Sequence, residues 1–340
     1  MAAQQPAPGT PFALALFETV RAMSADTTGV LRASYGDVES RVLDHLRGVA
    51  ESLGLASEFD AAGNLWMRRP GRDRGAAAFV TGSHADSVPR GGNYDGLAGI
   101  VAGLVVARRL HDEGRETLRD YVVLALRGEE SAWFGKPYLG SAALLGRLTE
   151  ADLALKHRDT GYPLAFYMRE AGAEPARLAH GRPLVDPARI AAFVELHIEQ
   201  GPVLDLEGIT IGAVEDLQGI SWTAVLVTGQ SNHAGTTPMR MRHDAGYCAA
   251  AIGVFVRNLV KEIGGRQVGT VGSITLHPNL TNVVAARARV TVDLRNTDDA
   301  VLSQAEQRLA AFLEKIARDE GVKIETHSLA RFAPVVFDKD

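Results

Sequence analysis

Residues 82–96, GSHADSVPRGGNYDG, contain side chains that commonly bind metals or act as acids and bases. This segment combines His84 with two aspartates, Asp86 and Asp95, and four glycines. Imidazole and carboxylate are ligand types that Zn²⁺ takes in proteins, and Mn²⁺, Co²⁺ or Ni²⁺ accept them too. Because Asp95 stands among glycines, the backbone can turn tightly there and direct its carboxylate toward a cation. Asp86, two residues after His84, is placed to accept that histidine's other ring N–H.

Two further segments carry the same kinds of side chain directly after apolar runs. Glu129 and Glu130 follow YVVLALRG, and His197 lies in AAFVELHIEQG. Neighbouring side chains diverge in a regular backbone, so one glutamate can bind metal while the other serves as general base. Each feature alone is more often a hydrogen-bonded core residue or a solvated surface residue. Their recurrence at successive strand ends favours a hydrolase site with two metal ions.

The elements that must position these residues alternate between strands and helices. Apolar runs at 76–82, 121–127 and 191–201 predict buried strands, and the spacing at 96–114 predicts a helix that ends at a glycine. This alternation predicts an α/β domain with a mostly parallel sheet and helices on both faces. Ligands of such sheets bind beyond the carboxyl ends of the strands, where these side chains should converge.

From about residue 213 the order of elements becomes β-α-β-β-α-β, which is the ferredoxin-like arrangement. The predicted strands are 223–228, 269–276, 288–295 and 322–328, and the predicted helices are 244–265 and 299–321. We therefore expect an inserted domain over 213–328. The remaining segments, 1–212 and 329–340, would then form one discontinuous domain.

Composition restricts the class of partner and the compartment. Charged residues make up 23% of the chain and the net charge is −5, with no basic block, which argues against nucleic-acid and membrane-surface partners. The single cysteine, Cys248, excludes a disulfide framework, and its apolar helical surroundings predict an inert buried thiol. Neither a signal peptide nor a membrane-length apolar run is apparent. The sequence indicates a cytoplasmic protein.

Four motifs resemble the M20 metallopeptidase superfamily and, within it, the hydantoinase/carbamoylase amidases. That branch contains N-carbamoyl-L-amino-acid hydrolases, β-ureidopropionase and allantoate amidohydrolase. The motifs are GSHADSVPRGGNYDGLAGI (82–100), RGEESAWFG (127–135), ELHIEQGPVLD (195–205) and GQSNHAGTTPMRMRHDA (229–245). HIEQGPVL and NHAGTTPM are specific to the branch, and the resemblance runs from about residue 10 to the last residue.

The resemblance implies a role for each matching position. It implies that the metal ligands are His84, Asp95, Glu130 and His197, with Asp95 bridging two ions. It implies that Glu129 is the catalytic general base and that Asp86 orients His84. It also implies a substrate-binding set of His233, Asn282, Arg295 and Gln200. The resemblance also implies that the inserted domain is a lid through which two chains form a homodimer. In this homodimer, His233 of one chain would reach the active site of the partner subunit.

The chemistry of three of these side chains agrees with the implied roles. The Arg295 guanidinium offers a fork suited to a substrate carboxylate. Asn282 can both donate and accept, which fits a ureido or carboxylate group. His233 lies among turn residues, where it can donate to a developing oxyanion. From the residues alone, Arg295 is more often a surface ion pair and Asn282 a turn residue.

The function implied is metal-dependent hydrolysis of a linear C–N amide or ureido bond in an N-carbamoyl amino acid or an allantoate-like substrate. Two alternatives stay open: an M20 aminoacylase or dipeptidase, and an inactive, truncated remnant that only binds partners.

Two departures from the family pattern bear on these alternatives. Trp133 stands where many members have an arginine, which we expect to reshape the pocket. A fifth metal ligand, the histidine of a GAGHDA-type motif, has no counterpart in the 340 residues. We therefore expect this chain to lack the family's C-terminal portion and to be weakly active or inactive alone.

Overall fold

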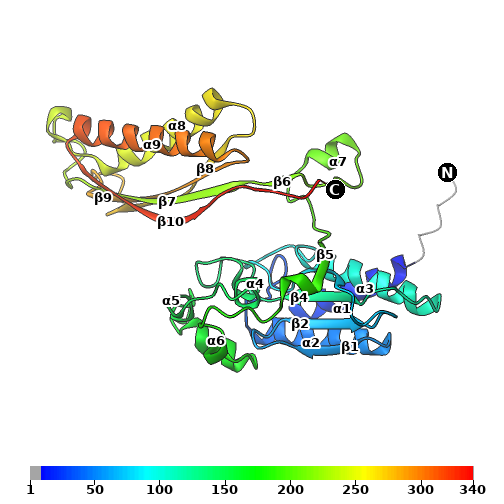
Figure 1. Ribbon diagram of the computed structural model, residues 1–340. Helices are drawn as coiled ribbons and strands as arrows, with labels where there is room; N and C mark the ends of the chain where they lie inside the picture. The colour runs from blue at the N-terminus through cyan, green and yellow to red at the C-terminus, as the bar shows by residue number, and fades with distance from the viewer. Residues whose placement is uncertain (1–8, 340) are drawn as a thin grey trace, which may run out of the picture. The chain divides into compact units, whose positions relative to one another are not determined.

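The computed structural model describes residues 9–339 of the chain, which divides into two compact units (Figure 1). The first unit spans Met1–Val203 and the second spans Leu204–Asp340. Among the described residues, no helix combines the length and the apolar character needed to cross a membrane.

The first unit is built on a mixed five-stranded sheet. Its strands are β1 (Ala56–Phe59), β2 (Leu65–Arg69), β3 (Ala78–His84), β4 (Tyr121–Leu126) and β5 (Ile190–Val194), in the order β1-β2-β4-β3-β5. Strand β3 pairs in parallel with both β4 and β5, whereas β2 pairs antiparallel with β1 and β4. The predicted α/β class with a parallel core is therefore confirmed.

Helices pack on both faces of this sheet. The longer ones are α1 (Thr10–Ser24), α2 (Asp37–Ser52) and α3 (Leu97–Asp112), and the shorter ones are α4 (Leu139–Leu144), α5 (Glu150–Leu153) and α6 (Leu164–Glu170). Helix α7 (Val203–Glu207) spans the boundary between the two units and has no buried residue. Because side chains alternate along a strand, Val123 of β4 packs with α1, α2 and α3, while Val122 and Leu124 pack with Leu144 on the opposite face.

The third predicted strand differs from expectation. A buried strand over 191–201 was expected, but β5 ends at Val194 and forms the edge of the sheet. Phe193 is 45% exposed and Val194 is 52% exposed. The prediction of burial is therefore wrong for these residues, because an apolar run cannot distinguish an edge strand from a central one. The other predicted elements correspond to β3, α3 and β4 within two residues.

The second unit confirms the ferredoxin-like order. Its elements are β7 (Gly219–Thr228), α8 (Ala245–Ile263), β8 (Val268–His277), β9 (Arg287–Asn296), α9 (Asp299–Glu320) and β10 (Lys323–Phe332). The four strands form an antiparallel sheet in the order β10-β7-β9-β8, and α8 and α9 cover one face (Figure 1). Asp244 caps α8 and Asp298 caps α9 through backbone N–H groups of the first turn.

The core of the second unit lies between the helices and the sheet. Val290, Val292 and Leu294 of β9 alternate inward and meet buried side chains of α8, including Cys248. Burial raises the pKa of the Cys248 thiol to about 12, so this thiol is protonated at neutral pH. The expectation that this cysteine is buried is thus confirmed.

The last strand of this sheet is longer than predicted. A strand ending at residue 328 was expected, but β10 continues to Phe332 beyond a bulge between Ser328 and Ala330. The bulge breaks the residue alternation that the prediction followed. Beyond it, β11 (Val335–Val336) pairs antiparallel with β6 (Asp216–Leu217).

A buried ion pair joins α2 to the segment that follows β4. Arg127 Nη1 lies 2.7 Å from Glu39 Oε2, and the two side chains are 2% and 0% exposed. The same Glu39 oxygen accepts the Tyr35 N–H at 2.7 Å, and Arg127 Nε donates to Gly63 O at 2.8 Å. This pair ties the segment that carries Glu129 to the first helical layer.

Replacing Arg127 by methionine should destabilise the first unit strongly. The variant leaves the Glu39 carboxylate buried without its cation, which costs about 3–5 kcal/mol of unfolding free energy. Chemical denaturation followed by circular dichroism measures the change. The matched control is Arg41→Met, which breaks the exposed pair with Asp37; such pairs contribute only about 0–1 kcal/mol. Equal losses in the two variants would contradict a structural role for the buried pair.

Candidate metal centre

Three strand ends of the first unit deliver the predicted side chains to one place. His84 is the last residue of β3, Glu129 and Glu130 follow β4, and His197 follows β5. Because β3, β4 and β5 are parallel, their carboxyl ends share one edge of the sheet. His84 Nε2 lies 3.4 Å from His197 Nε2 and 3.6 Å from Asp95 Oδ1.

Asp95 is the third member of the first group of possible ligands, with His84 and His197. Its Oδ1 lies 3.2 Å from His197 Nε2 and is buried, with no hydrogen-bond donor in favourable geometry. Ligand atoms of His84, Asp95 and His197 all lie within 4.8 Å of one another. Two imidazole nitrogens and a carboxylate oxygen that face one another suit a divalent cation. The arrangement therefore fits a metal ion.

A second group of possible ligands shares His84. It contains Glu129 and Glu130, whose ligand atoms also lie within 4.8 Å of one another and of the histidine. Burial, and then the neighbouring Glu129, raise the pKa of Glu130 to about 7. Burial also raises the pKa of Glu129, although the nearby His84 opposes the shift. Crowded, half-buried carboxyls of this kind are stabilised in their charged form by a cation.

Beneath these ligands lies Asp86, which is fully buried. Its Oδ1 accepts the Glu129 N–H at 3.1 Å and lies 3.4 Å from His84 Nδ1. Its Oδ2 accepts the Glu130 N–H at 3.1 Å and the Ser34 hydroxyl at 2.6 Å. Asp86 therefore fixes both glutamate backbones through its carboxylate, and its backbone O, 3.1 Å from His84 Nδ1, also holds the edge of the histidine ring. It lies where an orienting carboxylate is needed.

The charges of the centre are strongly coupled. Burial alone would lower the pKa of His84, but Asp86 and Asp95 outweigh it and raise that pKa well above its usual value. Contact with Asp95 likewise raises the pKa of His197. The two histidines, His197 first, hold the pKa of the Asp95 carboxyl below its usual range. Asp95 is thus a carboxylate at neutral pH.

Gly96 explains how Asp95 can approach His84. Its φ is +65°, a left-handed conformation that side chains rarely adopt. A Cβ at this position would lie 2.4 Å from His84 O and 2.5 Å from the ring atom Cε1. Only glycine allows the backbone after Asp95 to lie against the histidine. The expected tight turn at the glycines is therefore present at Gly96.

Gly96→Ala should damage the centre more than the small change in size suggests. The added methyl must displace the His84 backbone or ring, so we expect metal affinity to fall at least about tenfold and stability by about 1–3 kcal/mol. Calorimetric zinc titration and thermal unfolding measure these effects. Gly92→Ala is the matched control, because a Cβ there meets nothing within 4 Å. Unchanged zinc affinity in Gly96→Ala would contradict the proposed geometry.

Gln200, predicted as a substrate-binding residue, contacts a predicted metal ligand. Its Nε2 donates to Asp95 Oδ2 at 2.8 Å. Its φ of 55° belongs to the left-handed region. In this position Gln200 orients the Asp95 carboxylate so that Oδ1 faces the histidines. Sequence reasoning missed this contact and the Ser34–Asp86 bond, because both join residues far apart in the chain.

Trp133 lies in the core of the first unit, where it is 3% exposed. Its Nε1 donates to Ser87 O at 2.8 Å, and its ring stacks on His157 with centroids 5.6 Å apart. Trp133 thus holds the backbone of Ser87, directly after Asp86, through this hydrogen bond. The sequence analysis expected Trp133 to change the shape of the substrate pocket.

The substrate-binding candidates of the second unit separate into two groups. His233 forms a bridge with Val283, and Ala234 N donates to Asn282 O at 2.9 Å, so His233 and Asn282 lie in adjoining loops. These loops lie at the end of the sheet where β9 begins, because Gly229 N donates to Ala286 O. Arg295 lies near the other end of β9, roughly 26 Å along the strand from its first residue.

The Arg295 guanidinium is already engaged within the second unit. Its Nε and Nη2 donate to both carboxylate oxygens of Asp293 at 2.9–3.1 Å. Its Cζ also lies 5.8 Å from the centre of the Trp222 ring. The side chain is therefore held in a fixed direction on the sheet face opposite the helices.

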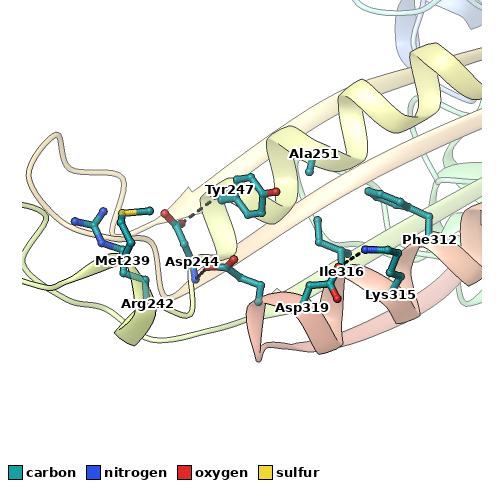
Figure 2. Close-up of a pocket in the computed structure, with 10 residues that line it drawn as sticks. Met239, Arg242, Asp244, Tyr247, Ala251, Phe312, Lys315, Ile316 and Asp319 are labelled. Atoms are coloured by element: carbon teal, nitrogen blue, oxygen red, sulfur yellow. Dashed lines mark hydrogen bonds and ion pairs between the residues drawn. The ribbon is translucent and has the colours of Figure 1, made fainter.

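A groove in the second unit is lined by none of the predicted site residues. It lies along α8 and α9, and its lining includes Arg242, Tyr247, Phe312, Lys315 and Asp319 (Figure 2). Two of the lining residues, Lys315 and Asp319, form an ion pair along α9. No predicted metal ligand or substrate-binding residue lines it. The groove is not the predicted centre.

Comparisons with known proteins identify the family. Residues 80–333 match the model of peptidase family M20/M25/M40. The chain is 36% identical over 309 residues to the N-carbamoyl-L-amino acid amidohydrolase of Geobacillus stearothermophilus, covering 91% of this chain and 74% of that protein. It is 32% identical over 293 residues to the allantoate amidohydrolase of Bacillus subtilis, covering 85% of this chain and 69% of that protein.

Solved structures agree with this result. A crystal structure of an amidase of the hydantoinase/carbamoylase family from Burkholderia multivorans matches with a TM-score of 0.84 and 35% identity. The match covers 97% of this chain and 79% of that one. Members of the M20 family are metal-dependent, in agreement with the grouped ligands around His84. The chain therefore belongs to the M20/M25/M40 peptidase family and, within it, to the hydantoinase/carbamoylase amidases.

Proposed function

We propose that this protein is a metal-dependent amidohydrolase that cleaves a linear C–N bond in an N-carbamoyl amino acid or an allantoate-like ureido acid. The observation that carries the proposal is the convergence of His84, Asp95 and His197 with Glu129 and Glu130 at one sheet edge. The relatives named N-carbamoyl-L-amino acid and allantoate amidohydrolase support the substrate class.

Two divalent ions are proposed as cofactors, zinc first and manganese, cobalt or nickel as alternatives. Their ligands would be His84, Asp95, Glu130 and His197, with Asp95 contacting both ions. When bound, such ions polarise the carbonyl of the substrate and make water a better nucleophile. Imidazole and carboxylate donors are compatible with all four metals.

Glu129 is proposed as the general base. Its backbone is fixed by Asp86, and its Oε2 lies 4.0 Å from His84 Nε2, beside the ligand group. A carboxylate there can take a proton from the attacking water and pass it to the leaving nitrogen. Asp86 holds the ring of His84 and the backbones of both glutamates, and it is assigned an orienting role.

The lid is proposed to supply the substrate-binding residues. Arg295 would bind the substrate carboxylate, and His233 would donate to the oxyanion, with Asn282 and Gln200 as further pocket residues. One protomer cannot place both Arg295 and His233 on a single small molecule, because they lie at opposite ends of its sheet. A homodimer formed through the lid removes this difficulty, since His233 of one protomer can serve the site of its partner.

The division into domains and the compartment also remain proposals. We retain residues 1–212 and 329–340 as the proposed metal-binding domain and residues 213–328 as the proposed lid and dimerisation domain. Among the described residues, however, β10 extends the lid sheet to Phe332, and β11 pairs with β6 in the second unit. We also retain a cytoplasmic location, without nucleic-acid or membrane partners.

A substrate panel tests the proposed function. Protein isolated from its source is loaded with zinc or manganese and assayed with an N-carbamoyl-L-amino acid, allantoate, an N-acetyl amino acid and a dipeptide. We expect ammonia from one of the first two and no turnover of the others. Hydrolysis of only the N-acetyl amino acid or the dipeptide would replace the proposal with an aminoacylase or dipeptidase. No turnover of any compound by the metal-loaded protein would favour a binding remnant.

A further inference from the structure

The loop that carries His233 is closed at its base and fastened along one side. Gln230 N donates to His243 O at 2.9 Å, which closes residues 230–243 into a loop. Ala234 N donates to Asn282 O at 2.9 Å, and Val284 N donates to Asn232 O at 2.8 Å. The backbone on both sides of His233 is therefore fixed, although its ring is exposed.

Two backbone amides hold one nitrogen of the His233 ring. Gly235 N donates to Nδ1 at 3.1 Å, and Thr236 N donates to the same atom at 3.3 Å. A ring nitrogen that accepts hydrogen bonds carries no proton, so the neutral imidazole must carry its proton on Nε2. Nε2 is therefore a hydrogen-bond donor, and the loop selects this tautomer.

Arg242 holds the peptide group that makes the first of these contacts. Its Nη2 donates to Ala234 O at 2.5 Å, and its Nε donates to Thr237 O at 3.0 Å. Ala234 O and Gly235 N belong to one planar peptide group, with the carbonyl and the N–H on opposite sides. Arg242 therefore binds the carbonyl edge of this peptide group, and His233 Nδ1 binds its opposite, N–H edge. Figure 2 shows Arg242 in the loop that precedes α8.

We infer that Arg242 is a positioning residue that locks the turn of residues 234–237 and thereby keeps His233 as an Nε2–H donor. With this tautomer His233 can donate to a substrate oxygen but cannot take a proton through Nε2. The inference rests on the proposed function, because it explains how His233 would stabilise an oxyanion. The inference also gives His233 a different role from Glu129: His233 donates a hydrogen bond, whereas Glu129 is the proposed base.

Nitrogen-15 NMR of histidine-labelled protein reads the tautomer without any assay of activity. Long-range proton–nitrogen correlations distinguish a protonated from an unprotonated ring nitrogen, and the His233→Gln variant assigns the signal among the ten histidines. We expect unprotonated Nδ1 and protonated Nε2 in the wild type and a tautomer mixture in Arg242→Met. Arg240→Met is the matched control, because Arg240 is an exposed arginine in the same loop. It should retain the wild-type signals.

A double-mutant cycle tests whether Arg242 acts through His233. In the wild-type background, Arg242→Met should lower kcat about 10- to 100-fold with little change in KM, because a misplaced donor loses its effect in the transition state. In a His233→Ala background the same change should have almost no further effect. Arg242→Lys, which can still donate to Ala234 O, should recover part of the loss. Thermal unfolding of each variant checks that the fold persists.

The outcomes separate this inference from the proposed function. A protonated Nδ1 in the wild type, or an unchanged tautomer in Arg242→Met, would overturn the inference whatever the kinetics. Multiplicative kinetic effects in the cycle would also overturn it. An unchanged kcat in His233→Ala would instead refute the oxyanion role in the proposed function, while the NMR result on the tautomer would stand.

Discussion

Replacing Glu129 by glutamine should lower kcat about 10³-fold while metal binding stays within about tenfold of the wild type. Glutamine keeps the shape of the side chain but cannot accept a proton at neutral pH. The Glu129 backbone N–H that Asp86 holds is unchanged by the substitution. Steady-state ammonia release and calorimetric zinc titration measure the two effects.

The neighbouring glutamate provides the matched control for this experiment. Glu130→Gln changes the same side chain one residue later, at a position whose backbone N–H is also held by Asp86. If Glu130 is a metal ligand, this variant should lose zinc affinity and recover activity at high zinc. Glu129→Gln should not recover at any zinc concentration. Recovery of both variants, or of neither, would contradict the separate roles assigned to the two residues.

Asp86→Asn should weaken the centre more than an isosteric change normally does. Both carboxylate oxygens face donors, so an amide NH₂ in either position would meet the N–H of Glu129 or that of Glu130. Burial alone would raise the pKa of Asp86, but contacts with His84 first, and then Ser34, hold it below its usual value. The native network therefore requires a carboxylate.

We expect Asp86→Asn to lower zinc affinity about 10- to 100-fold, as for other partners of metal ligands. Unfolding free energy should fall by about 1–3 kcal/mol, because at least one buried donor loses its acceptor. Asp37→Asn, on an exposed helical position, is the control: it should leave zinc affinity unchanged and lower the unfolding free energy by no more than about 1 kcal/mol. Ser34→Ala removes a single donor and should show a smaller loss. Wild-type zinc affinity in Asp86→Asn would refute the orienting role.

Local patterns were sufficient to predict the elements that carry the centre. His84 ends a strand, Glu129 and Glu130 follow the next one, and parallel pairing brings them together as expected. The ferredoxin-like order of the second unit was also predictable, because each strand and helix there has a clear period. The exposure of β5 was not predictable from the sequence, since the burial of a strand depends on which elements lie beside it.

The contacts that orient the ligands could not be read from the sequence. Ser34 reaches Asp86 across 52 positions, and Gln200 reaches Asp95 across 105. No local spacing encodes such pairs, because they arise only when separate segments fold against one another. The position of Arg295 relative to His233 is a similar case. It follows from the register in which β7 pairs with β9, which the order of the elements does not specify.

The central claim is that metal ions held around His84 are needed for hydrolysis of a ureido bond. The most direct test adds zinc stepwise to metal-free protein isolated from its source and records ammonia release from an N-carbamoyl-L-amino acid at each step. We predict no release without metal, a rise with each addition, and a plateau near two ions per chain. Full release before zinc is added, or zinc binding that never produces ammonia from this substrate or from allantoate, would contradict the account.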